Sequence, residues 1–221
     1  MSTSQDEVTR EHMMRVVEHA RNLFSLLRPS IDLETSNMGV APITDEEIYY
    51  GALYHDVGKL ESNHYLLPIE QQPPKANHVV HGYNFLIKNG FPESIAISSL
   101  LHHEGWHTSK YFGKQTKISR LQHIKHILQN PFKYFNSPAQ QKEGLASLYN
   151  APLDTVPAEF KRAILMSHII KIADEIDDRL VPRGTTEHKL GLNEYMNMIF
   201  KTGKLRPEWK EAVMGYVATL A

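Results

Sequence analysis

The chain has 221 residues, 41% of them apolar and 22% charged, with a formal net charge of −1, which suits one domain over residues 1–221 with a buried core. The near-neutral charge argues against DNA or RNA binding, and no apolar run is long enough to span a membrane. The absence of cysteine excludes disulfides and thiolate metal sites, and the polar, acidic first residues are unlike a secretory signal, so we expect a cytoplasmic protein.

The first predicted helix covers about residues 8–27, where apolar residues recur at helical spacing. His12 lies on the same stripe as those apolar residues, so we expect it to face inward. Pro29, Gly39 and Pro42 then predict a loop.

A second predicted helix begins at Thr44, because Thr44 and Glu47 have the spacing of a capping box. Gly58 is placed to end this helix as a left-handed cap residue. That assignment puts His55 and Asp56 in the last turn, where the helix dipole disfavours a carboxylate unless a positive charge lies beside it.

Further helical patterns follow, most of them bounded by proline or glycine. They cover residues 78–90, 91–105 and 157–180, with a last stretch after Pro207. Between about 107 and 158 the signals are weaker and predict short helices with a broken middle. No period-2 alternation is long enough to predict a strand, so we expect an all-α fold.

Histidine is unusually frequent, with 13 in the chain, and several histidines are grouped with acidic residues. Inward-facing or helix-terminal His and Asp residues come from five predicted helices: His12, His55, Asp56, His78, His102, His103 and Asp174. Imidazole and carboxylate ligands without thiolate suit Fe, Mn, Zn or Ni, and suit Mg alone less well. The pattern therefore predicts a metal site.

Each of these residues also has an ordinary structural interpretation. His12 could be a hydrogen-bonded core histidine, and the two adjacent histidines could be stabilised by the dipole of the helix that they end. Asp174 could pair with Lys171, and Asp56 with Lys59, as exposed ion pairs three residues apart. Taken together these interpretations require several unrelated burials in one chain, so we favour the metal site.

Five short motifs follow one another along the chain. In order they are HMMRV, HDVGK, HVVHG, LLHHE and KIADEID. This succession resembles the HD superfamily of metal-dependent phosphohydrolases and, within it, the HD-GYP subgroup of cyclic di-GMP phosphodiesterases. The sequence departs from that subgroup in two places, because HVVHG lacks the subgroup's proline and the segment after HHE lacks the glycine-tyrosine-proline loop.

The resemblance implies an HD-domain helical bundle with an insertion at about 107–158, and a centre of two divalent metal ions. Fe or Mn fits best, and Ni, Zn or Mg are alternatives. One metal would be held by His12, His55, Asp56 and Asp174. Asp56 would bridge to the second metal, which would be held by His78, His102 and His103. Such a pair activates a water for attack on phosphorus.

The resemblance also implies residues that act on the substrate, which we expect to be a phosphorylated small molecule such as a nucleotide. Lys59 is placed to neutralise phosphate charge beside the catalytic Asp56. Further candidates for substrate contact are Glu104, Asp177 and Arg183. We expect the insertion to cover the pocket as a lid, with a surface decoration or dimer contact as the alternative.

Two other functions fit the same ligand types. Some HD-superfamily proteins are similar in their ligands but are di-iron oxygenases that activate dioxygen. A degenerate HD domain can also act as a non-catalytic signalling module, although such a domain is expected to have lost metal ligands, and every matched ligand is present here.

Overall fold

A computed structural model describes residues 5–61, 76–104, 157–181, 190–202 and 206–220. Every regular element in these ranges is helical, which confirms the all-α prediction. The predicted insertion at about 107–158, and with it the predicted lid, lies almost entirely outside the described residues. Within these ranges, no helix has both the length and the apolar character needed to cross a membrane.

The described elements follow in this order: α1 (Gln5–Asn37), α2 (Asp45–Leu53), α3 (Val57–Glu61), α4 (Ala76–Lys88), α5 (Glu93–Leu101), a 3₁₀ turn (His102–Glu104), α10 (Ala158–Leu180), α11 (Leu192–Lys201), a second 3₁₀ turn (Pro207–Trp209) and α12 (Lys210–Ala218).

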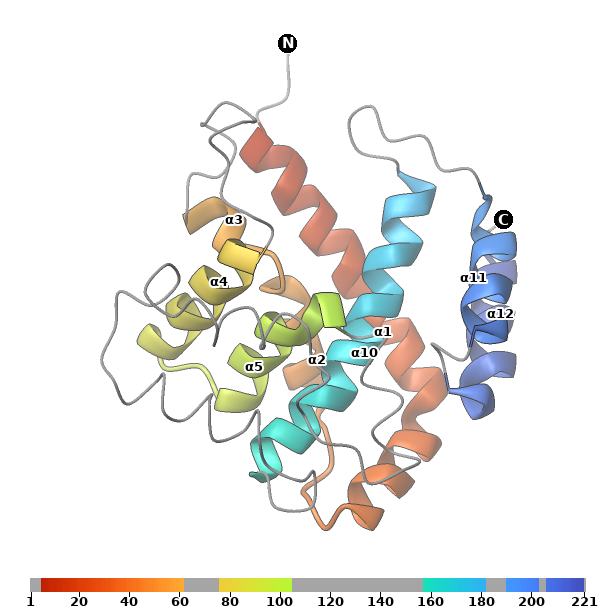
Figure 1. Cartoon of the computed structure of the whole chain (residues 1–221), viewed down its shortest axis with the longest axis horizontal. Coiled ribbons are helices and arrows are strands. Elements are labelled where there is room, and N and C mark those ends of the chain that lie inside the picture. Colours follow the sequence, from red (N-terminus) through yellow and green to blue (C-terminus); the bar gives the residue numbers. More distant parts are fainter. Residues whose placement is uncertain (1–4, 62–75, 105–156, 182–189, 203–205, 221) are drawn as a thin grey trace.

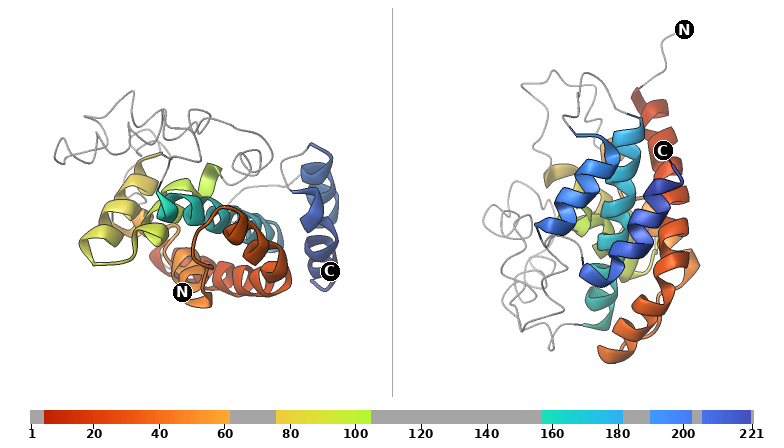
Figure 2. Two further views of the ribbon diagram at one scale, coloured as in Figure 1. Left: turned by 90° about the horizontal axis from the view of Figure 1, so that it is seen from below. Right: turned by 90° about the vertical axis from the view of Figure 1, so that its right-hand side faces the viewer.

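Helices α1 and α10 form the centre of the fold and pack against each other (Figure 1). Helices α2 and α5 pack against this pair, and the views in Figure 2 place α3 and α4 on one side of it and α11 and α12 on the other. The contact surface is apolar, with Leu23 and Phe24 of α1 and Leu165 and Ile169 of α10 completely buried. Burial of these faces is the main favourable term that holds the two central helices together.

The first helix is longer than predicted, because it continues through Pro29 to Asn37. A proline inside a helix removes one backbone hydrogen bond and costs roughly 3 kcal/mol. Here the buried face of the helix continues past the proline, with Leu27 and Ile31 both in the core. Packing of that face outweighs the cost of the proline, so the prediction of a loop at Pro29 was wrong.

The prediction for Gly58 was also wrong. Helix α2 ends at Leu53, and Gly58 lies inside the short helix α3 without a positive φ angle. A Cβ atom on Gly58 would lie 1.8 Å from the carbonyl oxygen of His78 on α4. Glycine is therefore needed here for the close approach of α3 and α4, and not to end a helix.

The other helix boundaries agree better with the prediction. Gly90, with a φ of 76°, follows α4, and Pro92 directly precedes α5. The strong pattern at 157–180 forms α10, and the stretch after Pro207 forms α12. Helix α11 was not predicted, although its apolar residues Leu192, Met196 and Ile199 have helical spacing.

Candidate metal centre

A sharp turn between α2 and α3 positions His55 and Asp56. Because α2 ends at Leu53, Asp56 lies directly before the first residue of α3, and its carbonyl oxygen accepts a hydrogen bond from the Lys59 amide at 2.9 Å. The expectation that Asp56 lies in the last turn of a helix was therefore wrong. A carboxylate at the start of a helix is favoured by the helix dipole.

Helix α2 is anchored at its first turn by Glu47. The predicted capping box is present: Glu47 accepts a hydrogen bond from the Thr44 amide at 3.0 Å, and the Glu47 amide donates to the Thr44 hydroxyl at 3.2 Å. Glu47 also accepts a hydrogen bond from Ser94 of α5 at 2.9 Å and forms an ion pair with Arg162 of α10. These contacts fix α2, and hence the turn that follows it, against two neighbouring helices.

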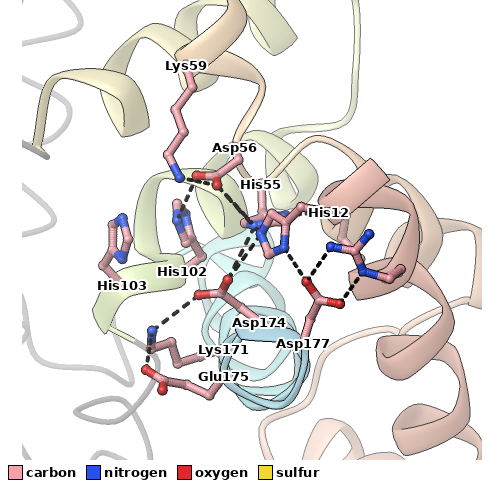
Figure 3. A network of polar contacts seen from close by, with 12 residues as sticks. His12, His55, Asp56, Lys59, His102, His103, Lys171, Asp174, Glu175 and Asp177 are labelled. Carbon is pink, nitrogen blue, oxygen red and sulfur yellow. Dashed lines mark hydrogen bonds and ion pairs between the residues drawn. The ribbon is translucent and has the colours of Figure 1, made fainter. Parts of the chain in front are cut away.

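The first half of the site contains His12 of α1, His55 and Asp174 of α10. Nε2 of His12 lies 3.3 Å from Oδ1 of Asp174, and Nε2 of His55 lies 3.9 Å from the same oxygen. All three residues are buried, and Figure 3 shows them meeting at one point between α1, the turn after α2 and α10.

The second half contains His78 of α4 and the adjacent His102 and His103 of the first 3₁₀ turn, together with Asp56. Oδ1 of Asp56 lies 3.3 Å from Nε2 of His78 and 3.6 Å from Nε2 of His102. Nε2 of His103 lies 3.0 Å from Nε2 of His78. One potential ligand atom from each of the four residues lies within 4.8 Å of the others.

The carboxylate of Asp56 joins the two halves. Its Oδ1 faces His78 and His102, whereas its Oδ2 lies 3.6 Å from Nε2 of His55 and 3.8 Å from Nε2 of His12. Each oxygen is therefore directed toward a different group of histidines. This is the arrangement that a carboxylate needs to bridge two cations.

Hydrogen bonds at the opposite ring nitrogen orient three of the histidines. Nδ1 of His55 donates to the carbonyl oxygen of Ala52 at 2.7 Å, and Nδ1 of His102 donates to that of Ser99 at 2.6 Å. Nδ1 of His12 donates to Oδ2 of Asp177 at 2.6 Å. With the proton on Nδ1, the lone pair of each ring is on Nε2, the nitrogen that faces the centre.

The electrostatic environment keeps three of the histidines neutral and the two carboxylates charged. Burial lowers the pKa of His55 to about 4, and burial likewise lowers the pKa values of His102 and His103 well below their usual range. Burial alone would raise the pKa of Asp56, but the positive charge of Lys59 holds it well below normal. The pKa of Asp174 is lowered in the same way, with Lys171 opposing the effect of burial. These are the protonation states that metal binding requires.

The residues fit a metal centre in three respects. Nε2 of His55 and Nε2 of His102 are buried without a hydrogen-bond partner, which is costly unless a cation binds there. Ligand atoms at about 2.1 Å from one metal lie roughly 3.0–3.4 Å apart. The shortest separation between a ring nitrogen and a carboxylate oxygen is 3.3 Å in each half, and the others are 3.6–3.9 Å, so a small inward shift would bring the atoms to bonding distance. The donor set of imidazole and carboxylate suits a divalent transition metal.

Residues 9–179 match the family described as HD domain. The chain belongs to the HD domain family. Most HD domains are metal-dependent phosphohydrolases and bind divalent metals, although some members are non-catalytic. Searches of curated proteins and of solved structures found no significant match.

The structure brings together all seven residues that the sequence proposed as ligands of this HD domain: His12, His55, Asp56, His78, His102, His103 and Asp174. Metal binding by these residues remains a prediction. Lys59 lies beside them and donates to Oδ2 of Asp56.

The other three proposed residues have different outcomes. Asp177 is buried and contacts His12 and Arg15, whose Nε donates to Oδ1 of Asp177 at 2.6 Å. Its two oxygens face a potential metal ligand and a guanidinium, and its contact with a substrate stays a prediction. The side chain of Glu104 and all of Arg183 lie outside the described residues.

Sequence reasoning missed Arg15 and treated Lys171 only as one half of an exposed ion pair. Arg15 lies three residues after His12 and one turn along α1, and this spacing was the available signal. Its buried partner Asp177 is 162 residues away in the chain, so the contact has no local signature.

Proposed function

We propose that this HD domain protein is a phosphohydrolase that uses two divalent metal ions, Fe or Mn, to cleave a phosphate ester of a nucleotide or cyclic dinucleotide. The observation that supports this proposal best is the orientation of Asp56, whose two oxygens face two separate groups of histidines. A single-metal site would need only one of these groups. Family membership supports the hydrolytic reaction, and the resemblance of the motifs to HD-GYP domains supports the substrate class.

When bound, the metal pair would activate a water for in-line attack on phosphorus and neutralise the charge that develops on the phosphoryl oxygens. Asp56 would hold the pair together, with His12, His55 and Asp174 on one side and the three remaining histidines on the other. The ester P–O bond breaks as the new P–O bond forms, and the leaving oxygen takes up a proton.

Lys59 supplies a further positive charge at the same place. Its ammonium group contacts Oδ2 of Asp56, and its side chain is 15% exposed, so it lies at the border between the buried ligands and solvent. We infer that Lys59 orients a phosphoryl oxygen of the substrate by a charge-assisted hydrogen bond.

The proposal is tested by turnover of the protein reconstituted anaerobically with Mn²⁺ or Fe²⁺. The substrates are cyclic di-GMP, a linear dinucleotide and mononucleotides, with products separated by chromatography and oxygen uptake followed in parallel. We compare wild type with Asp56→Ala and with the control Asp45→Ala, which removes an exposed carboxylate paired with Arg28 at 2.5 Å. Lys59→Met is compared with Lys88→Met, an exposed lysine on α4.

We expect cleavage of at least one phosphate ester that is lost on chelation of the metal and in Asp56→Ala, and retained in the control. Lys59→Met should lower kcat/KM by roughly 10²-fold or more, as removal of a charge-stabilising donor does in other enzymes. Hydrolysis that survives both chelation and Asp56→Ala would contradict the proposal. So would oxygen uptake that depends on an added substrate while no ester is cleaved.

A further inference from the structure

Lys171 of α10 is a buried lysine on the side of Asp174 that faces away from His12 and His55. Its Nζ lies 3.3 Å from Oδ2 of Asp174 and 2.7 Å from Oε1 of Glu175, and its side chain is only 10% exposed. In Figure 3 the two oxygens of Asp174 point in different directions, one toward His12 and His55 and the other toward Lys171.

A buried ammonium group is costly, so this placement requires compensation. Transfer of an unpaired charge into a protein interior costs several kcal/mol. The carboxylates of Asp174 and Glu175 supply this compensation, because each has an oxygen within 3.3 Å of the Lys171 ammonium. The side chain is therefore a cation that is held by two anions.

Glu175 is in turn fixed by residues outside the metal centre. Arg179, one turn further along α10, has its Nη2 4.0 Å from Oε2 of Glu175, and Tyr195 of α11 interacts with the same carboxylate. The Arg179 guanidinium lies over the Tyr195 ring, 3.4 Å from its centroid. A chain of contacts thus connects α11 through Glu175 and Lys171 to Asp174.

We propose that Lys171 is a positioning residue that holds Oδ2 of Asp174, so that this carboxylate presents only Oδ1 to the metal centre. Glu175 and Tyr195 keep the Lys171 ammonium in place. This inference rests on the metal centre proposed above, but it does not depend on which reaction the centre catalyses.

The sign of the change in metal affinity separates positioning from simple charge repulsion. An ammonium near a dication repels it, so removing the charge would tighten metal binding if repulsion were the main effect. If Lys171 mainly orients Asp174, its removal lets the carboxylate rotate, and metal binding weakens. Loss of partners that orient metal ligands typically lowers metal affinity by roughly 10- to 100-fold.

The experiment measures Co²⁺ affinity by competition with a chromogenic chelator and records the visible absorption spectrum of the Co²⁺ protein. The variants are Lys171→Met, Lys171→Arg and the control Lys201→Met, which removes an exposed lysine at the end of α11. Lys171→Met leaves Glu175 without its closest cation and can impair folding. The double variant Lys171→Met/Glu175→Gln removes both charges of this ion pair, and the unfolding temperature of each metal-free variant is recorded.

We expect Lys171→Met, or the double variant where the single one does not fold, to bind Co²⁺ about 10- to 100-fold more weakly with a changed spectrum. Lys171→Arg should stay within a few-fold of wild type with the same spectrum, and Lys201→Met should not differ. Wild-type or tighter Co²⁺ binding with an unchanged spectrum in the variants that remove the ammonium would overturn the inference. Both measurements are made without substrate, so their outcome does not depend on whether phosphohydrolase activity is found.

Discussion

Replacing Asp177 by asparagine changes the contact that orients His12 while keeping the volume of the side chain. Asp177 is ionised in the folded protein, because its hydrogen bonds with His12 and Arg15 outweigh burial and lower its pKa. It accepts from Nδ1 of His12 at 2.6 Å and from Nε of Arg15 at 2.6 Å. Asparagine has one acceptor oxygen in place of two, so it cannot accept equally well from both groups.

The expected magnitude follows from the position of this contact behind a metal ligand. A carboxylate that accepts from Nδ1 fixes the ring and makes Nε2 more basic, and its loss typically lowers metal affinity by roughly 10- to 100-fold. This corresponds to about 1.4–2.8 kcal/mol of binding free energy. The folded state should also lose about 1–3 kcal/mol, because a buried charge-assisted hydrogen bond is replaced by a weaker one.

The assay is Zn²⁺ or Mn²⁺ affinity by chelator competition near pH 7.5, with denaturant unfolding of the metal-free protein in parallel. Asp45→Asn is the matched control, since it makes the same chemical change at a side chain that is 64% exposed and pairs with Arg28. If Asp177→Asn folds and binds metal within twofold of wild type, Asp177 does not determine the orientation of His12, and our account of the first half of the site is wrong.

Three further predictions concern packing, pH and metal. Gly58→Ala should destabilise the protein by about 3 kcal/mol or more in a urea titration, because its Cβ would lie 1.8 Å from the His78 carbonyl oxygen. The control Gly215→Ala, whose Cβ would have no atom within 4 Å, should be neutral or stabilising by up to about 1 kcal/mol. Burial, with Arg206 nearby, lowers the pKa of His168 from 6.5 to about 3, so the unfolded state binds an extra proton below pH 6.5 and stability falls as the pH falls. Between pH 7 and pH 5 the free energy of unfolding of wild type should fall by roughly 2 kcal/mol more than that of His168→Phe. An equal fall in both proteins would contradict this prediction. Free metal at 100 times its Kd should raise the unfolding free energy by about 2.7 kcal/mol, a gain that a chelator should abolish in a thermal melt.

Local sequence predicted the helices well where the boundary signals agreed with the packing. The capping box at Thr44 and the positive-φ glycine at Gly90 act within a few residues, so their effect is visible in the sequence. Pro29 and Gly58 misled the prediction because tertiary packing decided the role of each. Burial of the α1 face outweighs the local cost of Pro29. Gly58 is required by the close approach of the His78 carbonyl oxygen and does not end a helix.

The candidate ligands were also predictable, because their types and order along the chain are read directly. The two ion pairs that were considered as alternatives to a metal site are both present, and both lie within the site. Lys171 does contact Asp174 and Lys59 does contact Asp56, but these pairs are buried or nearly so, and each carboxylate also faces the histidines. An exposed ion pair and a buried one can have the same spacing of three residues, so the sequence could not show that these pairs are buried.

The sequence by itself determined which side chains are available to the centre: imidazoles and carboxylates on separate helices, with no thiolate. The tertiary structure alone decided how they are arranged. It places Nε2 of His12, His55 and His102 toward the centre, and it directs one oxygen of Asp56 to each half. It also brings Asp177 into contact with His12 and Lys171 into contact with Asp174. His12 and Asp177 are 165 residues apart and meet only because α1 packs along α10. Contacts of this kind depend on the burial of two whole helix faces, and no local pattern in the chain records them.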